Sequence, residues 1–216
     1  MNGEAKGAAG PVDQKDRGEK VDAGLRWYGD FFFRPLLWPF SRLSISPNLI
    51  TCAGIALALA SGYFLAVQNV PMAAVFFALS GVFDLIDGYV AKKLDMVTKF
   101  GSFLDSFSDR ISDAAIFTGL MVYYLKNAEG LYAGLALVCL VLSFLISYTR
   151  AKAESLGISG KAGLMSRAPR LLFLGFGLFF NSLSPWILKV VLWVLAALLL
   201  ETLVERFLSI WKVLQE

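Results

Sequence analysis

The chain has 216 residues, of which 57% are hydrophobic and 17% are charged, and its mean hydropathy is +0.63. Soluble proteins carry roughly 25% charged residues, so this composition excludes an ordinary soluble domain and requires apolar surface that faces lipid. The formal net charge is only +3, and no nucleic-acid partner is expected. Because there is no histidine, proton transfer near neutral pH falls to a carboxylate, a lysine, a tyrosine or water, and the carboxylates are the candidates.

Two segments precede the apolar part of the chain. Residues 1–24 are rich in Gly, Ala, Lys, Asp and Glu without apolar periodicity, which predicts a disordered tail. Residues 25–46 mix aromatic and basic residues, a composition suited to the headgroup region of a membrane. They are predicted to form an amphipathic interfacial helix, although an ordinary entry into the first membrane span fits the composition about as well.

Six apolar stretches follow, each near the roughly 20 residues that a helix needs to cross the hydrocarbon core of a membrane. They predict an all-α, polytopic membrane domain over residues 47–206, followed by a short tail at 207–216. The expected transmembrane helices are 48–68, 71–91, 101–124, 130–149, 165–182 and 185–205.

The basic residues predict the orientation of these spans. The loop after the second span carries three lysines, and the segment after the fourth carries five basic residues, whereas the opposite connections carry only Lys126. By the positive-inside rule, both termini and both basic segments are cytoplasmic, in a multi-pass protein of the cell membrane.

Four aspartates lie at the cytoplasmic ends of the second and third spans. Asp84 and Asp87 are three residues apart, and Asp105 and Asp109 are four apart, so each pair occupies one face of its helix. Two adjacent helices can then direct four carboxylates at one point, and this negative charge requires a cation. Oxygen ligands without Cys, His or Met favour Mg²⁺ or Mn²⁺, and two such ions can share four carboxylates. Mg²⁺ held this way commonly completes its coordination with substrate phosphates, which favours phosphate chemistry.

Clustered carboxylates in a membrane also mark ion pathways, so a small cation transporter is an alternative. Against transport, all four acids lie at one membrane face. Beyond the basic residues at the start of the fifth span, the last two spans contain few polar residues, among them Asn181, Lys189 and Glu201.

The aspartate segment resembles the signature of the CDP-alcohol phosphatidyltransferases, which reads D-x2-D-G-x2-A-R, about eight residues, then G-x3-D-x3-D. This chain has Asp84-Leu-Ile-Asp87-Gly88-Tyr-Val-Ala91-Lys92, eight residues, then Gly101-Ser102-Phe-Leu-Asp105-Ser-Phe-Ser-Asp109. One fixed position departs, since Lys92 stands where the family has arginine. Lysine keeps the charge but loses the bidentate guanidinium, which affects a cytidine or phosphate contact and not the reaction class.

The resemblance implies that Asp84, Asp87 and Asp105 ligate a pair of divalent ions, with Asp109 completing the set and acting as the general base. It implies a CDP-lipid donor, CDP-diacylglycerol or CDP-archaeol, from which a polar alcohol displaces CMP without a covalent enzyme intermediate. It also implies a homodimer. The residues expected to bind the CDP-lipid are Asn48 and Thr51, in a P-N-x2-T element, together with Asp84, Gly88, Ala91, Lys92, Gly101 and Ser102.

The basic segment after the fourth span bears on the acceptor alcohol. On composition alone its charges are ordinary positive-inside residues. The segment Ser147-Tyr148-Thr149-Arg150-Ala151-Lys152, followed by Ser166-Arg167-Ala168-Pro169-Arg170, is however similar to the branch of the family that uses inositol phosphate. That similarity implies that inositol 1-phosphate is the acceptor and that its phosphate is bound by Arg150, Lys152, Arg167 and Arg170.

Three points qualify this acceptor assignment. Arg110 and Asp113 are candidates for the acceptor pocket, but a structural ion pair of Asp113 with Arg110 is the favoured interpretation of Asp113. Ser166 and Pro169 stand where many relatives have acidic residues. A glycerol 3-phosphate acceptor would use a similar basic pocket.

Overall fold

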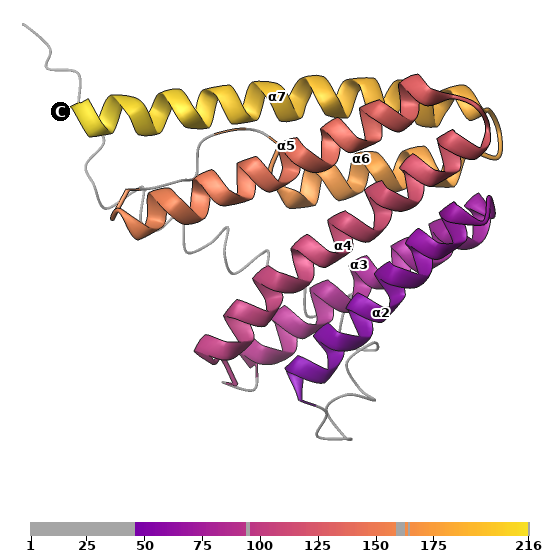
Figure 1. Cartoon of the computed structure of the whole chain (residues 1–216). Helices are drawn as coiled ribbons and strands as arrows, with labels where there is room; N and C mark the ends of the chain where they lie inside the picture. The colour runs from indigo at the N-terminus through magenta and orange to yellow at the C-terminus, as the bar shows by residue number, and fades with distance from the viewer. Residues whose placement is uncertain (1–45, 94–95, 159–162, 164, 216) are drawn as a thin grey trace, which may run out of the picture. The chain divides into compact units, whose positions relative to one another are not determined.

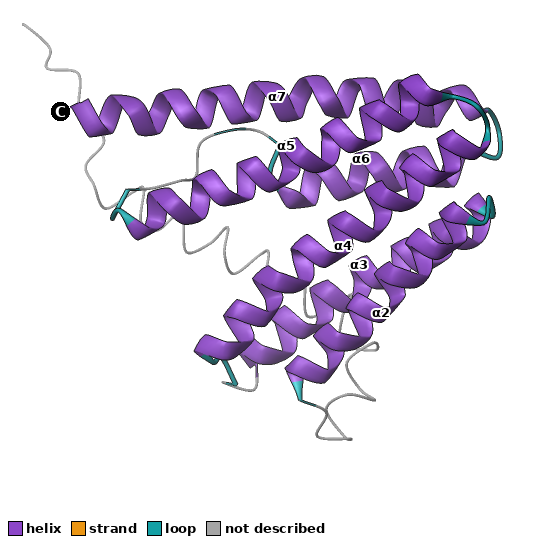
Figure 2. Cartoon of the chain, viewed as in Figure 1, coloured by secondary structure: helices purple, strands orange, loops and turns teal. Residues whose placement is uncertain are grey.

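The structure is a computed structural model that describes residues 46–93, 96–158, 163 and 165–215. All regular elements in these residues are α-helices, which confirms the predicted fold class (Figure 2). The predicted tail and nearly all of the predicted interfacial segment lie outside the described residues. The helices are α2 (Pro47–Ala66), α3 (Val70–Lys93), α4 (Lys99–Lys126), α5 (Gly130–Ser155), α6 (Arg167–Phe180) and α7 (Pro185–Gln215) (Figure 1).

The six helices pack as a closed ring whose order differs from their order in the chain. α2 packs against α3 and α4, α3 against α6, α6 against α7, α7 against α5, and α5 against α4. In Figure 1, α2, α3 and α4 form one group, and α5, α6 and α7 form the other. The ring makes α3 and α6 neighbours, although two helices separate them in the sequence.

Local sequence places the start of α4 next to the start of α2. Thr98 caps α4, because its Oγ1 accepts a hydrogen bond of 2.9 Å from the backbone N–H of Gly101. Pro47 occupies the first turn of α2, where the missing N–H of proline costs no hydrogen bond. A Cβ at Gly101 would lie 3.4 Å from Oδ1 of Asn48, so the first turns of the two helices are in contact.

The backbones of α2 and α4 touch further along the two helices. A Cβ on Gly62 would lie 2.4 Å from the carbonyl oxygen of Ala115, and a Cβ on Gly119 would lie 2.5 Å from the carbonyl oxygen of Gly62. Only residues without a side chain permit this approach, which is a common device where membrane helices cross. The crossing fixes the position of α4, the helix that carries Asp105, Asp109 and Asp113.

The distribution of apolar side chains is that of a protein embedded in lipid. Leu65, Phe117, Leu192 and other apolar residues form a buried core between the helices. Large apolar side chains are also exposed on the outer faces, among them Leu172 with 75% of its surface accessible. Such a surface needs an apolar solvent, and α2, α3, α5 and α7 are each long and apolar enough to cross a membrane.

The other two helices differ from plain apolar spans. α4 has 28 residues but carries the charged side chains of Asp105, Asp109, Arg110 and Asp113. α6 has only 14 residues, which corresponds to about 21 Å and is shorter than the roughly 30 Å hydrocarbon core. α7, in contrast, continues to Gln215, so residues 207–215 of the predicted tail extend the last helix.

The contact between α2 and α4 generates a prediction about stability. Gly62→Ala should lower the stability of the folded protein by about 1–3 kcal/mol or more, because a methyl group has no space beside the Ala115 carbonyl. The matched control is Gly134→Ala on α5, where no atom lies within 4 Å of an added Cβ, and this change should be neutral or slightly stabilising. The midpoint of thermal unfolding in detergent measures both, and equal midpoints would contradict the close crossing.

Candidate active site

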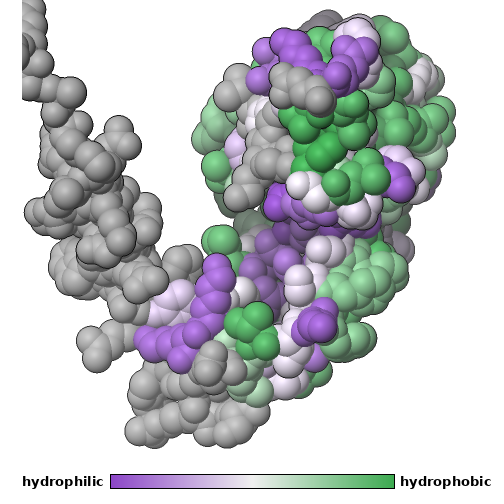
Figure 3. Space-filling model, turned by 90° about the vertical axis from the view of Figure 1, so that its left-hand side faces the viewer, coloured by the Kyte–Doolittle hydropathy of each residue, from purple (hydrophilic) through white to green (hydrophobic). Residues whose placement is uncertain are grey.

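Hydrophilic side chains gather in a hollow at the end of the ring where α4 begins and α5 ends. Figure 3 views the molecule from this side and shows hydrophilic surface lining the hollow, with largely hydrophobic surface around it. This is the end of the ring that contains the predicted aspartates and the first residues of α6.

Three of the four predicted aspartates form a carboxylate cluster. Asp84 on α3 and Asp105 and Asp109 on α4 each place one carboxylate oxygen within 4.8 Å of the others. Asp87 lies one turn further along α3, where it is buried and its Oδ2 accepts a hydrogen bond of 2.6 Å from the hydroxyl of Thr51. Asp87 therefore ties α3 to α2, while the other three carboxylates face each other across the gap between α3 and α4.

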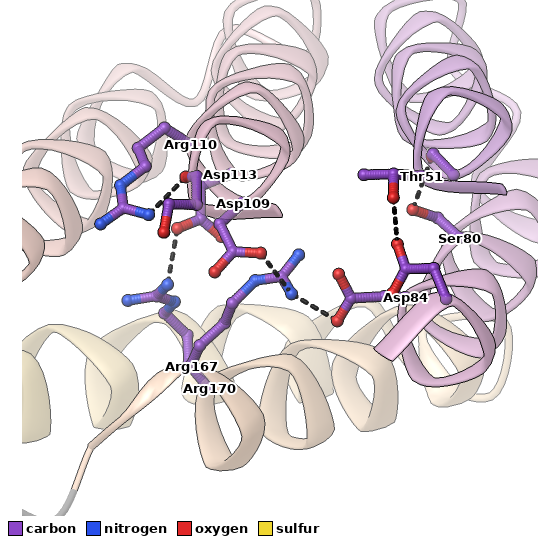
Figure 4. A network of polar contacts seen from close by, with 11 residues as sticks. Thr51, Ser80, Asp84, Asp109, Arg110, Asp113, Arg167 and Arg170 are labelled. Carbon is purple, nitrogen blue, oxygen red and sulfur yellow. Dashed lines mark hydrogen bonds and ion pairs between the residues drawn. The ribbon is translucent and has the colours of Figure 1, made fainter. Parts of the chain in front are cut away.

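The guanidinium group of Arg167, the first residue of α6, lies between two of these carboxylates (Figure 4). Its Nη1 donates a hydrogen bond of 2.5 Å to Oδ2 of Asp84 and forms an ion pair of 2.7 Å with Oδ1 of Asp109. Oδ1 of Asp109 is buried and accepts no hydrogen bond from the described residues, so the contact is electrostatic. One cationic nitrogen from α6 thus connects α3 with α4.

A second arginine of α6 forms a fully buried ion pair. Nη2 of Arg170 lies 2.6 Å from Oδ2 of Asp113, and the two side chains are only 3% and 5% exposed. The sequence had suggested Arg110 as the partner of Asp113. In the structure Arg110 instead donates to the carbonyl oxygen of Ser106 in its own helix. Removing one member of a buried pair leaves an uncompensated charge, so Arg170 fixes α6 against α4.

The residues predicted to contact the CDP-lipid lie around the starts of α2 and α4 and the end of α3. Asn48 lies beside Gly101, as described above, and Thr51 bonds to Asp87. Gly88 is exposed, and a Cβ placed there would meet no atom within 4 Å, so the space next to this backbone is open. Lys92 and Ser102 are exposed, and Ala91 is partly buried.

Two of the four predicted acceptor-binding residues make no ion pair with the aspartates in the described part of the chain. Nε of Arg150 pairs with Oε1 of Glu154 at 2.9 Å, and both side chains are about half exposed. Lys152 is exposed near the end of α5. Arg167 and Arg170 are therefore the members of the predicted basic set that contact the aspartates.

Several buried hydroxyl groups next to the aspartates were not identified from the sequence. Ser80, Ser108 and Ser112 line a narrow crevice together with Thr51, Asp84 and Asp87. The hydroxyl of Ser80 donates a hydrogen bond of 2.9 Å to the carbonyl oxygen of Gly54, which joins α3 to α2. Ser108 and Ser112 each follow an aspartate of α4 by three residues. The helical spacing that identified the aspartates could therefore have identified these serines on the same face.

An apolar groove of about 600 Å³ leads away from the carboxylates between α3 and α6. Asp84 and Arg167 line it, and so do the apolar residues Phe77, Leu171 and Phe179. Gly175 packs directly against Phe77, since a Cβ at Gly175 would lie 3.1 Å from Cε1 of Phe77. Charged groups and a hydrocarbon-like surface are thus continuous in one cavity.

The carboxylate cluster fits a divalent cation. Three carboxylate oxygens from two helices converge without any nitrogen or sulfur ligand, which is the donor chemistry that Mg²⁺ and Mn²⁺ prefer. The structure also places a positive charge there, because Arg167 lies between two of the three carboxylates.

The apolar helices and the carboxylate cluster are those expected of a membrane enzyme that acts on phosphate groups with a divalent cation. The sequence comparison identifies the class of enzyme. The model of the CDP-alcohol phosphatidyltransferase family matches residues 44–204, so the chain belongs to this family and is a CDP-alcohol phosphotransferase. Family membership decides against the cation transporter that the carboxylates alone had left open.

Two relatives that match over most of the chain are synthases of inositol phosphate lipids by name. The chain is 34% identical to the archaetidylinositol phosphate synthase of Methanothermobacter thermautotrophicus, with 83% of this chain and 93% of the relative covered. It is 36% identical to the phosphatidylinositol phosphate synthase of Corynebacterium glutamicum, covering 79% and 80% of the two chains.

A solved structure from the same group has a similar fold. The Mycobacterium tuberculosis phosphatidylinositol phosphate synthase with CDP-DAG bound matches with a TM-score of 0.75 and 29% identity, over 82% of this chain and 92% of the other. The same mycobacterial protein has been crystallised in complex with manganese and citrate.

The buried pair of Arg170 and Asp113 generates a prediction. Arg170→Met alone should destabilise the protein by about 3–5 kcal/mol, because it leaves the Asp113 carboxylate buried without its partner. Adding Asp113→Leu should recover most of this loss, since an apolar pair has no charge to compensate. Unfolding midpoints in detergent test the pair, with Arg150→Met as the exposed control. A double variant no more stable than Arg170→Met would exclude the pair as the cause.

The position of Arg167 predicts an effect on cation binding. Arg167→Met should increase the affinity for Mn²⁺ in the absence of substrates, because the guanidinium and the metal compete for Asp84 and Asp109. Titration of the purified protein with Mn²⁺, followed by electron paramagnetic resonance, measures the affinity. Arg150→Met, which removes an arginine paired with Glu154, should bind Mn²⁺ like the unmodified protein. Weaker binding by the Arg167 variant would show that this arginine supports the cation site.

Proposed function

We propose that the protein transfers a phosphatidyl-type group from a CDP-lipid to inositol 1-phosphate and releases CMP. The observation that carries the proposal is the continuity of Asp84, Asp109 and Arg167 with an apolar groove between α3 and α6. The charged end suits a diphosphate and a phosphorylated alcohol, and the groove suits hydrocarbon chains. The names of two relatives support the acceptor, because one is an archaetidylinositol phosphate synthase and the other a phosphatidylinositol phosphate synthase.

Asp84, Asp105 and Asp109 are the residues that would hold a divalent cation, Mg²⁺ or Mn²⁺. Asp87, one turn from Asp84, extends the set toward a second ion. When bound, such ions neutralise the diphosphate and stabilise the charge that develops on the departing CMP. Manganese in the mycobacterial relative supports this use of the site.

The donor lies along the α2, α3 and α4 side of the site. The open space at Gly88 leaves room for a nucleotide beside the backbone, and the predicted nucleotide-binding residues Asn48 and Gly101 lie next to each other at the starts of α2 and α4. The lipid chains then follow the groove past Phe77 and Phe179. The groove is lined by hydrocarbon and aromatic side chains, so it accepts ester-linked or ether-linked chains, and the CDP-DAG complex of the mycobacterial relative supports a CDP-lipid donor.

The acceptor phosphate binds to Arg167 and Arg170, with Arg110, Arg150 and Lys152 as further cationic groups from α4 and α5. Arg167 has two roles in this proposal. Without substrates, Arg167 neutralises the negative charge of Asp84 and Asp109. When a cation neutralises these carboxylates instead, the guanidinium is available to bind a phosphate. Arg170 keeps its partner Asp113 and holds α6 in place.

Asp109 acts as the general base. It lies on the face of α4 that meets Arg167, so an acceptor held by this arginine brings its hydroxyl to the same carboxylate. The hydroxyl proton passes to Asp109, the acceptor oxygen forms a bond to the lipid-linked phosphorus, and the bond from that phosphorus to CMP breaks.

The protein is proposed to work as a homodimer of six-span subunits in the cell membrane, with the site and both termini on the cytoplasmic side. The lysines near the end of α3 and the arginines at the start of α6 support this orientation, because basic residues favour the cytoplasmic side.

The test is CMP release by purified protein in detergent with Mg²⁺ and CDP-diacylglycerol, comparing inositol 1-phosphate, glycerol 3-phosphate, inositol and serine as acceptors. Release should require inositol 1-phosphate and should stop with EDTA. Asp109→Asn should abolish turnover, a loss of at least 10²-fold, while it leaves CDP-lipid binding intact.

The outcomes separate the parts of the proposal. Release with glycerol 3-phosphate alone would keep the chemistry and replace the acceptor. An active Asp109→Asn variant would remove Asp109 as the base. EDTA-insensitive release would remove the divalent cation from the reaction.

A further inference from the structure

Thr202, on the last helix, contacts the loop that leads into α6. Its Oγ1 accepts a hydrogen bond of 3.0 Å from the backbone N–H of Met165, and both residues are almost completely buried. The same side chain closes against Gly163, because a Cβ there would lie 2.5 Å from Cγ2 of Thr202. Gly163 has φ of +101°, a conformation that side chains with a Cβ rarely adopt, so glycine serves both the turn and the contact.

This contact lies two residues before Arg167. Met165 is followed by Ser166 in an extended conformation and then by Arg167, the first residue of α6. Ser166 is the N-cap residue, but its side chain makes no capping hydrogen bond. The start of α6 therefore lacks the usual side-chain cap, and the hydroxyl of Thr202 fixes the backbone just before it.

A second buried residue of α7 attaches this helix to α5. Arg206, one turn after Thr202, donates a hydrogen bond of 2.8 Å to the carbonyl oxygen of Ile146 on α5. α7 thus holds α5 and the beginning of α6 from one side. In the described part of the loop between them, the buried N–H of Met165 is held by α7.

We propose that Thr202 is a positioning residue for the transfer reaction, which sets the place of Arg167 through the backbone of Met165. The proposal rests on the function proposed above, because it assigns Arg167 to the acceptor phosphate. In the proposed reaction, Arg167 exchanges its contacts with Asp84 and Asp109 for the phosphate of the substrate. A displacement of α6 by about one ångström would move the guanidinium out of the position that this exchange requires.

The test compares Thr202→Val, which keeps the branched shape and removes the hydrogen-bond acceptor, with Thr202→Ser, which keeps the hydroxyl. Thr202→Val should raise the KM for inositol 1-phosphate about 10-fold, because the buried N–H of Met165 loses its acceptor, while the KM for CDP-lipid stays the same. Thr202→Ser should restore the acceptor KM. Thr118→Val, on the exposed side of α4, is the matched control and should leave both constants unchanged.

Hydrogen–deuterium exchange of the peptide containing Met165 gives a readout that needs no activity. Exchange should become faster in this peptide in Thr202→Val and stay slow in Thr202→Ser, while α2 and α3 stay protected in both. Faster exchange in all peptides of the Thr202→Val protein would indicate a general structural role and overturn the proposal. An equal rise of the KM values for inositol 1-phosphate and CDP-lipid would do the same. Unchanged exchange and kinetics would overturn it as well.

The two proposals fail in different ways. If no acceptor releases CMP in the unmodified protein, the proposed function fails, and the exchange experiment still decides whether Thr202 restrains the loop. If inositol 1-phosphate is used normally and Thr202→Val has the same acceptor KM, the function stands and the positioning role fails.

Discussion

The structure depends on the compensation of negative charge at one end of a bundle of membrane helices. Asp84, Asp105, Asp109 and Asp113 come from two helices that repel each other at this end unless a cation lies between them. Arg167 and Arg170 supply that charge from α6, the former between Asp84 and Asp109 and the latter against Asp113. Unpaired carboxylates inside a membrane are costly, so these contacts decide which helices can be neighbours.

The ring of helices follows from this requirement together with close packing elsewhere. Gly62 and Gly119 let α2 and α4 touch, which leaves Asp105 and Asp109 facing α3 across a gap that apolar side chains do not fill. α6 begins at this gap and runs along α3, and α7 covers α6 and α5 from the other side. Asp113 is buried at the charged end, whereas Asp84 and Asp109 are partly exposed. In the proposed site, Arg167 exchanges its carboxylate contacts for a ligand, whereas Arg170 keeps its contact with Asp113.

Sequence periodicity predicted the elements of this site better than the contacts between them. The spacing of three and four residues predicted that the aspartates of two helices converge, and Asp84, Asp105 and Asp109 do so, since helix geometry determines which residues share a face. It did not reveal that Asp87 turns toward Thr51, or that Asp113 pairs with Arg170. Such pairs join residues 36 and 57 positions apart, and no local pattern encodes them. Thr202 was missed for the same reason, because a threonine in an apolar helix has no distinctive pattern until its partner is known.

The distance along the chain between Asp84 and Arg167 has a consequence for biosynthesis. The two residues are 83 positions apart, so at about 5–20 residues per second the carboxylate is made roughly 4–17 s before its guanidinium partner. During that interval α4 is made, and α2, α3 and α4 emerge from the ribosome without the charge that later holds them together. The aspartates must then stay at the aqueous surface or acquire a metal ion from solution. Assembly of the ring therefore ends with α6 and α7, and a chain truncated before Arg167 would present its acidic end to the membrane without an arginine to neutralise it.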